Sequence, residues 1–185
     1  VGIRVDANDH YSTEEAIKFI NKIEQLNVEH VEQPISRYDF LGMREIRKSV
    51  NVPLMTDDMV STPLDAMNVI RLDAADRVKV KVTKHGIDGA IQIISMLSSA
   101  GKRAVLGHVF ETGLAAVAEA HLAMLFPDII GPHEIGSMEP LGVADKILQQ
   151  DPYCDHGSIT IPEGVGLGVS VDWEQVENYK VNLFC

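Results

Sequence analysis

The chain has 185 residues, of which 45% are hydrophobic, and its mean hydropathy of +0.03 is that of an ordinary globular protein. The formal net charge of −11 argues against a broad basic surface for nucleic acid, and no apolar run reaches the length of a membrane span. Two cysteines, Cys154 and Cys185, are too few for a disulfide framework. We therefore expect a cytoplasmic protein with neither a nucleic-acid partner nor a membrane partner.

Apolar strands alternate with amphipathic helices from the first residue onward. A strand is expected at residues 1–7, and the helix after it begins with Ser12 and Glu15, which have the spacing of a capping box. A second strand at 28–34 is followed by a helix around 39–49. Strands that alternate with helices in this way predict a parallel sheet.

The same alternation continues through the middle of the chain. A third strand is expected at 52–58, and Thr62 and Pro63 then have the character of the N-cap and first residue of a helix. The further elements expected are a strand at 77–83, a helix at 86–101, a strand at 103–108, a helix at 113–126, a strand at 128–136, a glycine-rich stretch at 159–172 and a short helix near 173–179.

Repeats of about 25 residues fit either a doubly wound sheet or a (β/α)8 barrel. Neither a GxGxxG motif nor a P-loop follows the first strand, so the nucleotide-binding form of the doubly wound sheet lacks its usual mark. We therefore expect an α/β fold of the (β/α)8-barrel type. About six βα units are present, whereas a full barrel has eight, so residues 1–185 are expected to form one partial barrel domain.

Three carboxylates stand at the ends of successive expected strands: Asp6 in "RVDAND", Glu32 in "VEQP" and Asp57 in "LMTDD". The carboxyl ends of barrel strands meet on the face that carries the active site, so these acids are expected to converge. Three adjacent carboxylates repel one another and need a cation, and oxygen ligands with open positions suit Mg²⁺, with Mn²⁺ as a substitute. The alternative is that each acid is a solvated loop residue or a helix cap, and their recurrence in register argues against it.

The next strand adds a basic group. In "VKVKV" the lysines and valines occupy opposite faces, so lysines point into the barrel if the valines pack on the helices. A desolvated lysine near a metal ion can act as a base near neutral pH, and Lys81 is the candidate. Lys84 falls in the following loop, so the simpler interpretation is that its side chain extends to the rim of the barrel. Lys79 would lie one layer deeper, and the sequence assigns it no role.

The order of these residues resembles the enolase superfamily, and within it the muconate lactonizing enzyme (muconate cycloisomerase) subgroup. The resemblance rests on the Asp of "RVDAN", the Glu of "EQP", the double acid of "MTDD" and the lysines of "KVTKHG", and it extends to "PEGVGLGV". It implies that Asp6, Glu32 and Asp57 bind Mg²⁺, that Lys81 is the acid/base residue, and that Asp58 orients the lysine or a ligand.

The resemblance also implies further site residues. Glu111 in "GHVFETG" is assigned to the catalytic set, and Asn8, His108 and Glu134 are assigned to substrate binding. His108 has a second interpretation as the base itself, as in the mandelate racemase subgroup. In that subgroup an Asp on the preceding strand supports the histidine, whereas the preceding strand here offers Lys81 and no Asp.

The implied activity is that of a Mg²⁺-dependent isomerase that abstracts the proton α to a substrate carboxylate and stabilises an enediolate. A muconate cycloisomerase and a racemase or epimerase of amino-acid derivatives both fit. Glu134 is a single acid where amino-acid epimerases of the subgroup often carry two, which weakens the dipeptide-epimerase interpretation. The alternatives are a dehydratase of acid sugars or hydroxy acids, a catalytically inactive fragment, and a scaffold that only binds metal.

The family also has a K-x-K motif on the second barrel strand and an N-terminal α+β capping domain, and both would precede the first residue of this chain. The sequence opens without Met, directly on the expected first strand. We therefore expect strands three to eight of the barrel, inactive without the missing part. The full-length form is expected to be a homo-oligomer that acts on a small-molecule carboxylate.

Overall fold

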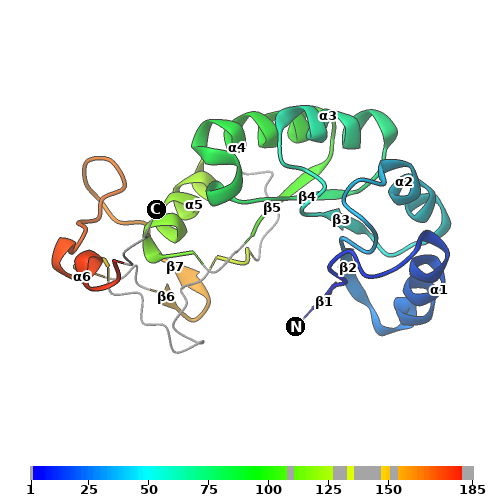
Figure 1. The fold of residues 1–185 in the computed structure, drawn as a ribbon, viewed down its shortest axis with the longest axis horizontal. Helices are drawn as coiled ribbons and strands as arrows, with labels where there is room; N and C mark the ends of the chain where they lie inside the picture. The colour runs from blue at the N-terminus through cyan, green and yellow to red at the C-terminus, as the bar shows by residue number, and fades with distance from the viewer. Residues whose placement is uncertain (1, 108–110, 127–132, 136–146, 151–153, 181–185) are drawn as a thin grey trace. The chain divides into compact units, whose positions relative to one another are not determined.

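The computed structural model describes residues 2–107, 111–126, 133–135, 147–150 and 154–180 (Figure 1). The chain divides into two compact units. The first comprises Val1–Gly107 with Asp128–His133, and the second comprises His108–Pro127 with Glu134–Cys185. The first unit contains the sheet, and the two units are considered separately below.

Five parallel strands form the sheet of the first unit. They are β1 (Ile3–Asp6), β2 (Val28–Glu32), β3 (Leu54–Thr56), β4 (Arg77–Val80) and β5 (Arg103–Leu106). Each strand pairs with the next one along the chain, in the order β1-β2-β3-β4-β5. A doubly wound sheet reverses its strand order at a switch point, whereas a (β/α)8 barrel keeps it consecutive. The expected barrel-type α/β fold is thereby confirmed.

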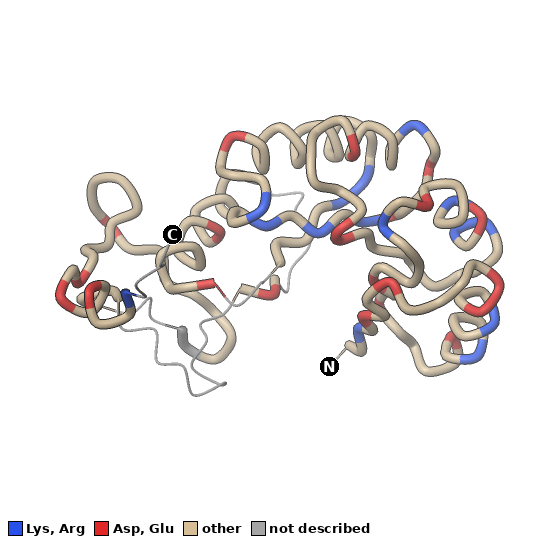
Figure 2. Tube along the Cα trace, in the orientation of Figure 1, with Lys and Arg blue, Asp and Glu red and all other residues tan. Residues whose placement is uncertain are grey.

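A helix follows each of the first four strands and returns the chain to the start of the next. These helices are α1 (Thr13–Ile23, extended by the 3-10 turn Glu24–Leu26), α2 (Phe40–Ser49), α3 (Pro63–Leu72) and α4 (Val82–Ser99). Consecutive helices pack on one another and together cover one side of the sheet (Figure 1). Charged residues are frequent along α1 and α2 and sparse along α4 (Figure 2). The helices thus separate one face of the sheet from solvent.

Side-chain caps set the starts of these helices. Ser12 and Glu15 form the predicted capping box, in which each side chain accepts a hydrogen bond from the other residue's backbone N–H. Thr62 forms a second box with Asp65, and Pro63 occupies the first turn as predicted. Such caps satisfy backbone donors that have no partner inside the helix. Local sequence therefore suffices to fix where α1 and α3 begin.

The hydrophobic core lies between the sheet and these helices. Strand β3 is buried throughout, and in β4 Val78 and Val80 are fully buried. The helices contribute the fully buried side chains of Ala16, Ile20, Met43, Ile46, Val69, Ile93 and Leu97. Lys79 lies between the two valines and reaches the Glu32 carboxylate instead. The alternation of valine and lysine read from the sequence therefore separates a packed face of β4 from a polar one.

The junction between β4 and α4 differs from the expectation. A strand over 77–83 and a helix from 86 were predicted, but β4 ends at Val80 and Lys81 is the N-cap of α4. The helix is interrupted at Gly86, whose φ of 66° and ψ of 171° are not helical. The turn forms because the backbone N–H groups of Lys84 and His85 both donate to the Lys81 carbonyl. Lys81 and Lys84 therefore share one helical turn.

The second unit contains α5 (Gly113–Leu125), the antiparallel pair β6 (Cys154–Asp155) and β7 (Ser158–Ile159), and α6 (Trp173–Asn178). The helices near 113–126 and 173–179 were predicted, and the β6–β7 hairpin was not. The predicted strand at 128–136 lies almost wholly outside the described residues, and 133–135 are not in a strand. Among the described helices, none is both long and apolar enough to cross a lipid bilayer.

Asp76, in the loop before β4, ties two neighbouring segments together. Its Oδ2 accepts from the Leu54 N–H at 2.9 Å, and its Oδ1 accepts from Arg47 Nε at 3.0 Å and Nη2 at 2.8 Å. Asp76→Ala is expected to lower the free energy of unfolding by about 2 kcal/mol, because a charged acceptor with several donors is lost. Urea unfolding checks this value, with Asp88→Ala on the exposed surface of α4 as the control. Equal losses in the two variants would contradict it.

Candidate active site

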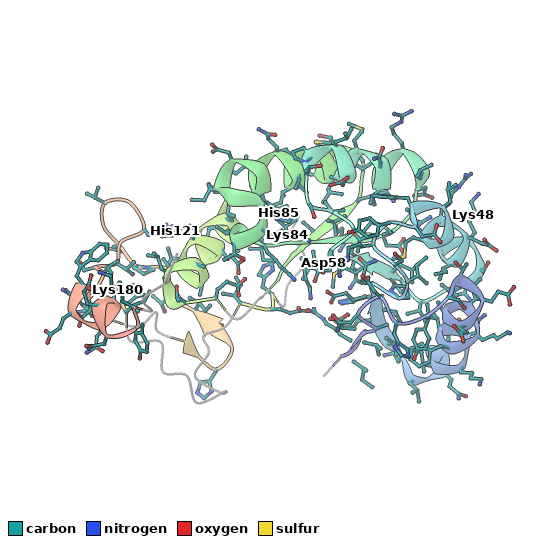
Figure 3. All side chains as sticks on the ribbon, viewed as in Figure 1. Lys48, Asp58, Lys84, His85, His121 and Lys180 are labelled. Atoms are coloured by element: carbon teal, nitrogen blue, oxygen red, sulfur yellow. The ribbon has the colours of Figure 1, made fainter. Side chains whose placement is uncertain are left out.

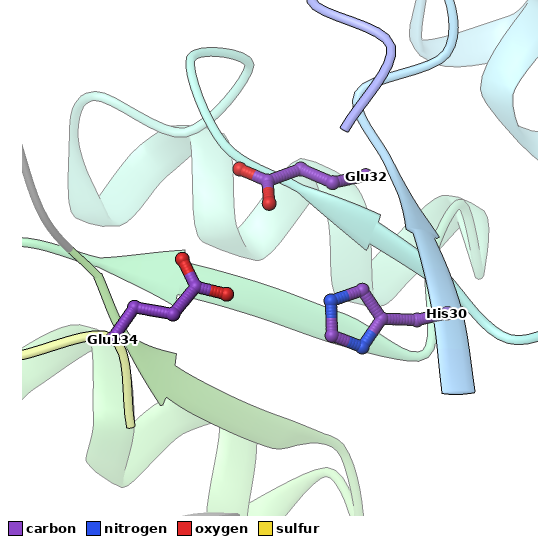
Figure 4. Close-up of side chains that lie close together, drawn as sticks. All are labelled: His30, Glu32 and Glu134. Carbon is purple, nitrogen blue, oxygen red and sulfur yellow. The ribbon is translucent and has the colours of Figure 1, made fainter. Parts of the chain in front are cut away.

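Asp6, Glu32 and Asp57 lie at the same end of neighbouring strands. Asp6 ends β1 and is in register with Glu32, which ends β2. Glu32 is in turn in register with Met55 of β3, two residues before Asp57. Figure 4 shows the Glu32 and His30 side chains projecting from β2 to the same side. The carboxyl ends of the strands thus bring the three acids to adjoining positions, as the sequence predicts.

Glu32 is the most buried of the three acids, with 3% of its surface exposed. Burial raises the pKa of Glu32 to about 7; the charge and hydrogen bond of Lys79 oppose this rise, and the charges of Asp6 and Asp57 add to it. Its Oε1 is buried and lies 2.6 Å from the Lys79 Nζ, without the geometry of a hydrogen bond. A buried carboxylate next to two more acids fits a bound cation.

Asp57 has the opposite electrostatic character. Burial by itself raises the pKa of Asp57, but the hydrogen bond and charge of Lys81, with the charges of Lys84 and Lys79, bring it below its ordinary value. The Lys81 Nζ donates to Asp57 Oδ2 at 2.6 Å. Asp57 is therefore ionised at neutral pH and available as an anionic ligand.

Lys81 and Lys84 both reach Asp57. Lys81 is 5% exposed and approaches from the N-cap position of α4. The sequence suggested that Lys84 extends to the rim, and this prediction is wrong. Its Nζ donates to the Asp57 carbonyl at 2.8 Å and lies 3.4 Å from Asp57 Oδ1. The sequence reading failed because it placed Lys84 in a loop, whereas the helical turn directs its side chain back over the sheet.

Asp58 lies beside this lysine. Figure 3 labels Asp58 and Lys84. The Asp58 Oδ1 is 3.4 Å from Lys84 Nζ, and its Oδ2 pairs with Arg37 Nη1 at 2.7 Å. The Nε of Arg37 also donates to Asp9 Oδ2 at 2.9 Å. Arg37 therefore connects the loops that follow β1 and β3. Nothing in the local sequence around Arg37 indicates this role, because both partners are distant along the chain.

Gln33 is a second residue that sequence reasoning missed. It follows Glu32 with a φ of 35°, and it is 3% exposed. Its Oε1 accepts from the backbone N–H groups of Asp57 at 3.0 Å and Met59 at 3.3 Å, while its Nε2 donates to the Ile35 carbonyl at 2.8 Å. Gln33 thus holds the loop that carries Asp57 in place. The available signal was an amide side chain directly after a predicted ligand.

His85 anchors the lysine-bearing turn to the same loop. Its Nε2 lies 3.0 Å from the Val60 carbonyl, and its Nδ1 lies 3.1 Å from the Lys81 backbone nitrogen. Burial lowers the pKa of His85, with the Val60 hydrogen bond opposing and the Lys84 charge contributing. The Nδ1 also lies 2.9 Å from the Lys81 carbonyl oxygen, so both ring nitrogens contact backbone polar atoms. His85 is thus a partly buried residue with a structural role, next to Lys84 along the chain.

The remaining predicted site residues are placed as follows. Asn8 is exposed, has a φ of 45°, and donates its backbone N–H to Asp6 Oδ1 at 3.0 Å. Glu111 is buried just before α5, and Glu134 is partly exposed; both belong to the second unit. His108 lies outside the described residues. Asn8 thus orients the first acid through its backbone rather than its side chain.

A consecutive parallel sheet with acids and lysines at the carboxyl ends of its strands has the layout of a barrel enzyme. Residues 1–176 match the family described as enolase C-terminal domain-like, and the chain belongs to this family of the enolase superfamily. The resemblance seen in the sequence is confirmed.

Curated relatives fall into two kinds. The chain is 36% identical over 172 residues to the L-Ala-D/L-Glu epimerase of Bacillus subtilis, covering 91% of this chain and 46% of that protein. It is 30% identical over 183 residues to muconate cycloisomerase 1 of Rhodococcus opacus, covering 98% and 48%. The chain therefore spans about half the length of the curated relatives it matches.

Solved structures similar to this chain include the same two kinds of enzyme. A dipeptide epimerase from Cytophaga hutchinsonii, complexed with Mg and D-Ala-L-Val, superposes with a TM-score of 0.88 at 28% identity, covering 96% of this chain and 48% of that one. The 2-chloromuconate cycloisomerase of Rhodococcus opacus 1CP gives a TM-score of 0.90 at 25% identity, covering 98% and 49%. Epimerases and cycloisomerases thus share this part of the fold.

Proposed function

We propose that the whole protein, of which this chain is the greater part of the barrel, is a Mg²⁺-dependent isomerase that removes the proton α to a substrate carboxylate. The observation that supports this most directly is the meeting of three strand-end acids with two lysines around Asp57. The relatives, which are cycloisomerases and epimerases, support the same class of reaction. We propose a cytoplasmic homo-oligomer that acts on a small-molecule carboxylate.

In this proposal Asp6, Glu32 and Asp57 hold Mg²⁺, for which Mn²⁺ can substitute. The bound ion would neutralise the negative charge that develops on the substrate carboxylate when the α-proton leaves. Lys81 removes and returns that proton. Lys84 is the second candidate for this role, because its side chain reaches the same carboxylate. The Lys84 side chain is also more exposed, at 17% against 7% for the side chain of Lys81.

The other site residues would support these steps. We propose that Asp58 orients Lys84 and that Asn8 fixes Asp6. Glu111 is proposed to complete the catalytic set. Substrate contacts are assigned to His108 and Glu134, together with Asn8.

Hydrogen–deuterium exchange tests the proposed reaction. The whole protein is incubated with Mg²⁺ in deuterated water, and NMR follows the α-proton of dipeptides, N-acyl amino acids and muconate. Exchange in a dipeptide or N-acyl amino acid would support an epimerase or racemase, and conversion of muconate would support a cycloisomerase. Loss of water from an acid sugar, added as a comparison, would favour the dehydratase alternative. No reaction with any of these substrates would count against the proposal.

The raised pKa of Glu32 predicts how Mg²⁺ binding depends on pH. The pKa is about 7 in the folded protein against an ordinary 4.5, so binding below pH 7 must displace a proton. Mg²⁺ affinity is expected to rise up to about pH 7 and to level off above it. By the same linkage, the metal-free fold loses stability as the pH rises through about 7, because a buried carboxyl group ionises there.

Titration calorimetry in two buffers of different ionisation enthalpy measures this effect. We expect release of about one proton per ion at pH 6 and almost none at pH 8. An affinity that stays constant between these two pH values would show that Glu32 is already ionised at pH 6 or is not a ligand.

A further inference from the structure

Lys79 is the one lysine of the site to which neither the sequence nor the proposed reaction assigns a role. It lies within β4 and is 5% exposed. Its Nζ donates to Glu32 Oε2 at 2.7 Å and lies 2.6 Å from Glu32 Oε1. Because these distances are nearly equal, the ammonium group straddles the end of the carboxylate. A cation that binds the Glu32 carboxylate would therefore compete with this ammonium group.

Gly107, which follows β5, makes room for this lysine. A Cβ atom at Gly107 would come within 2.4 Å of both Cγ and Cδ of Lys79. The Gly107 N–H also donates to the Val80 carbonyl at 2.9 Å, which fixes the glycine beside β4. The stem of Lys79 is therefore packed against backbone, and its charged end is held at Glu32 rather than free to reach solvent.

The two more buried acids of the three have cationic partners without a metal ion. Lys79 pairs with Glu32, and Lys81 and Lys84 contact Asp57. A divalent cation that binds the same acids adds positive charge beside these ammonium groups. Like charges a few ångströms apart repel more strongly in a buried site than in water.

We propose that Lys79 is a built-in counter-cation, which neutralises Glu32 in the metal-free protein and competes with Mg²⁺ for its carboxylate. This inference rests on the proposed metal site. A lysine that only oriented Glu32 would strengthen Mg²⁺ binding. In this proposal Lys79 weakens Mg²⁺ binding and stabilises the metal-free fold. Removing the ammonium group should reverse both effects.

Lys79→Met tests the inference in the whole protein, with the Mg²⁺ dissociation constant and the melting temperature as readouts. We expect affinity for Mg²⁺ to increase about tenfold or more, since one nearby positive charge is removed. We also expect a lower melting temperature without metal and a larger rise on adding Mg²⁺. Lys79→Arg keeps the charge and should bind Mg²⁺ as the unchanged protein does. Lys102→Met removes a lysine that pairs with Asp73, and should leave the affinity unchanged.

The outcomes separate the inference from the proposed function. Unchanged or weaker Mg²⁺ affinity in Lys79→Met, with binding still lost in Asp57→Asn, would overturn the role of Lys79 and leave the metal site standing. No Mg²⁺ binding by the unchanged protein would overturn both. If Lys79→Met folds only with Mg²⁺, a steeper dependence of its melting temperature on Mg²⁺ supports the inference. Failure of Mg²⁺ to restore its fold, while Lys79→Gln binds no more tightly than the unchanged protein, overturns it.

Discussion

Asp57→Asn is expected to abolish Mg²⁺ binding and catalysis together in the whole protein. The change removes one of three anionic ligands and the carboxylate that both Lys81 and Lys84 contact. We expect Mg²⁺ affinity to fall by more than about 100-fold and kcat/KM by about 10³-fold or more. Calorimetry measures the first value and α-proton exchange the second, and circular dichroism verifies that the variant folds.

Asp58→Asn is the matched control for this prediction. Asp58 is the adjacent residue, its side chain is 40% exposed, and its shortest ion pair is with Arg37. Its variant should retain Mg²⁺ binding, because Asp58 is not among the three proposed ligands. If Asp57→Asn bound Mg²⁺ as tightly as Asp58→Asn does, Asp57 would not be a metal ligand.

Lys81→Met is expected to lower the rate of α-proton exchange by about 10³-fold, because the proton then has no acceptor. The Mg²⁺ affinity should not weaken, since lysine is not a ligand and its charge opposes the ion. Lys84→Met is the matched variant, because Lys84 contacts the same carboxylate from the same helical turn. Single-turnover exchange, measured for both with one substrate, checks the assignment.

The two lysine variants also identify the base if the assignment is wrong. A larger loss in Lys84→Met would transfer the role to Lys84, in agreement with its greater exposure. Exchange that survives in both variants would remove lysine from the reaction and direct attention to His108.

Much of the fold can be predicted because it is encoded locally. The capping residues at Ser12 and Thr62 are within three residues of the groups they bind, so the starts of α1 and α3 can be read directly. Alternating valine and lysine gave the two faces of β4, and the repeated strand–helix order gave a parallel sheet. The boundary of β4 was misjudged because the β-branched Val80, Val82 and Thr83 favour a strand. The hydrogen bonds that end it depend on the turn itself.

The contacts within the site are harder to predict, because they join residues that are distant along the chain. Gln33 holds the loop that carries Asp57, and Arg37 joins Asp9 to Asp58. No spacing or periodicity relates these partners. Each contact exists only because neighbouring strands end at the same edge of the sheet.

The sequence by itself determined the class of fold and the positions of the three acids, because residues at the ends of successive parallel strands must share one edge. Only the tertiary structure decided which charge neutralises which acid. Lys79 reaches Glu32 because Gly107 leaves space beside β4, and Lys84 turns back to Asp57 because a helix begins at Val82. Pairing of buried charges depends on packing and on side-chain direction in three dimensions, and these are set by elements that the chain brings together only on folding.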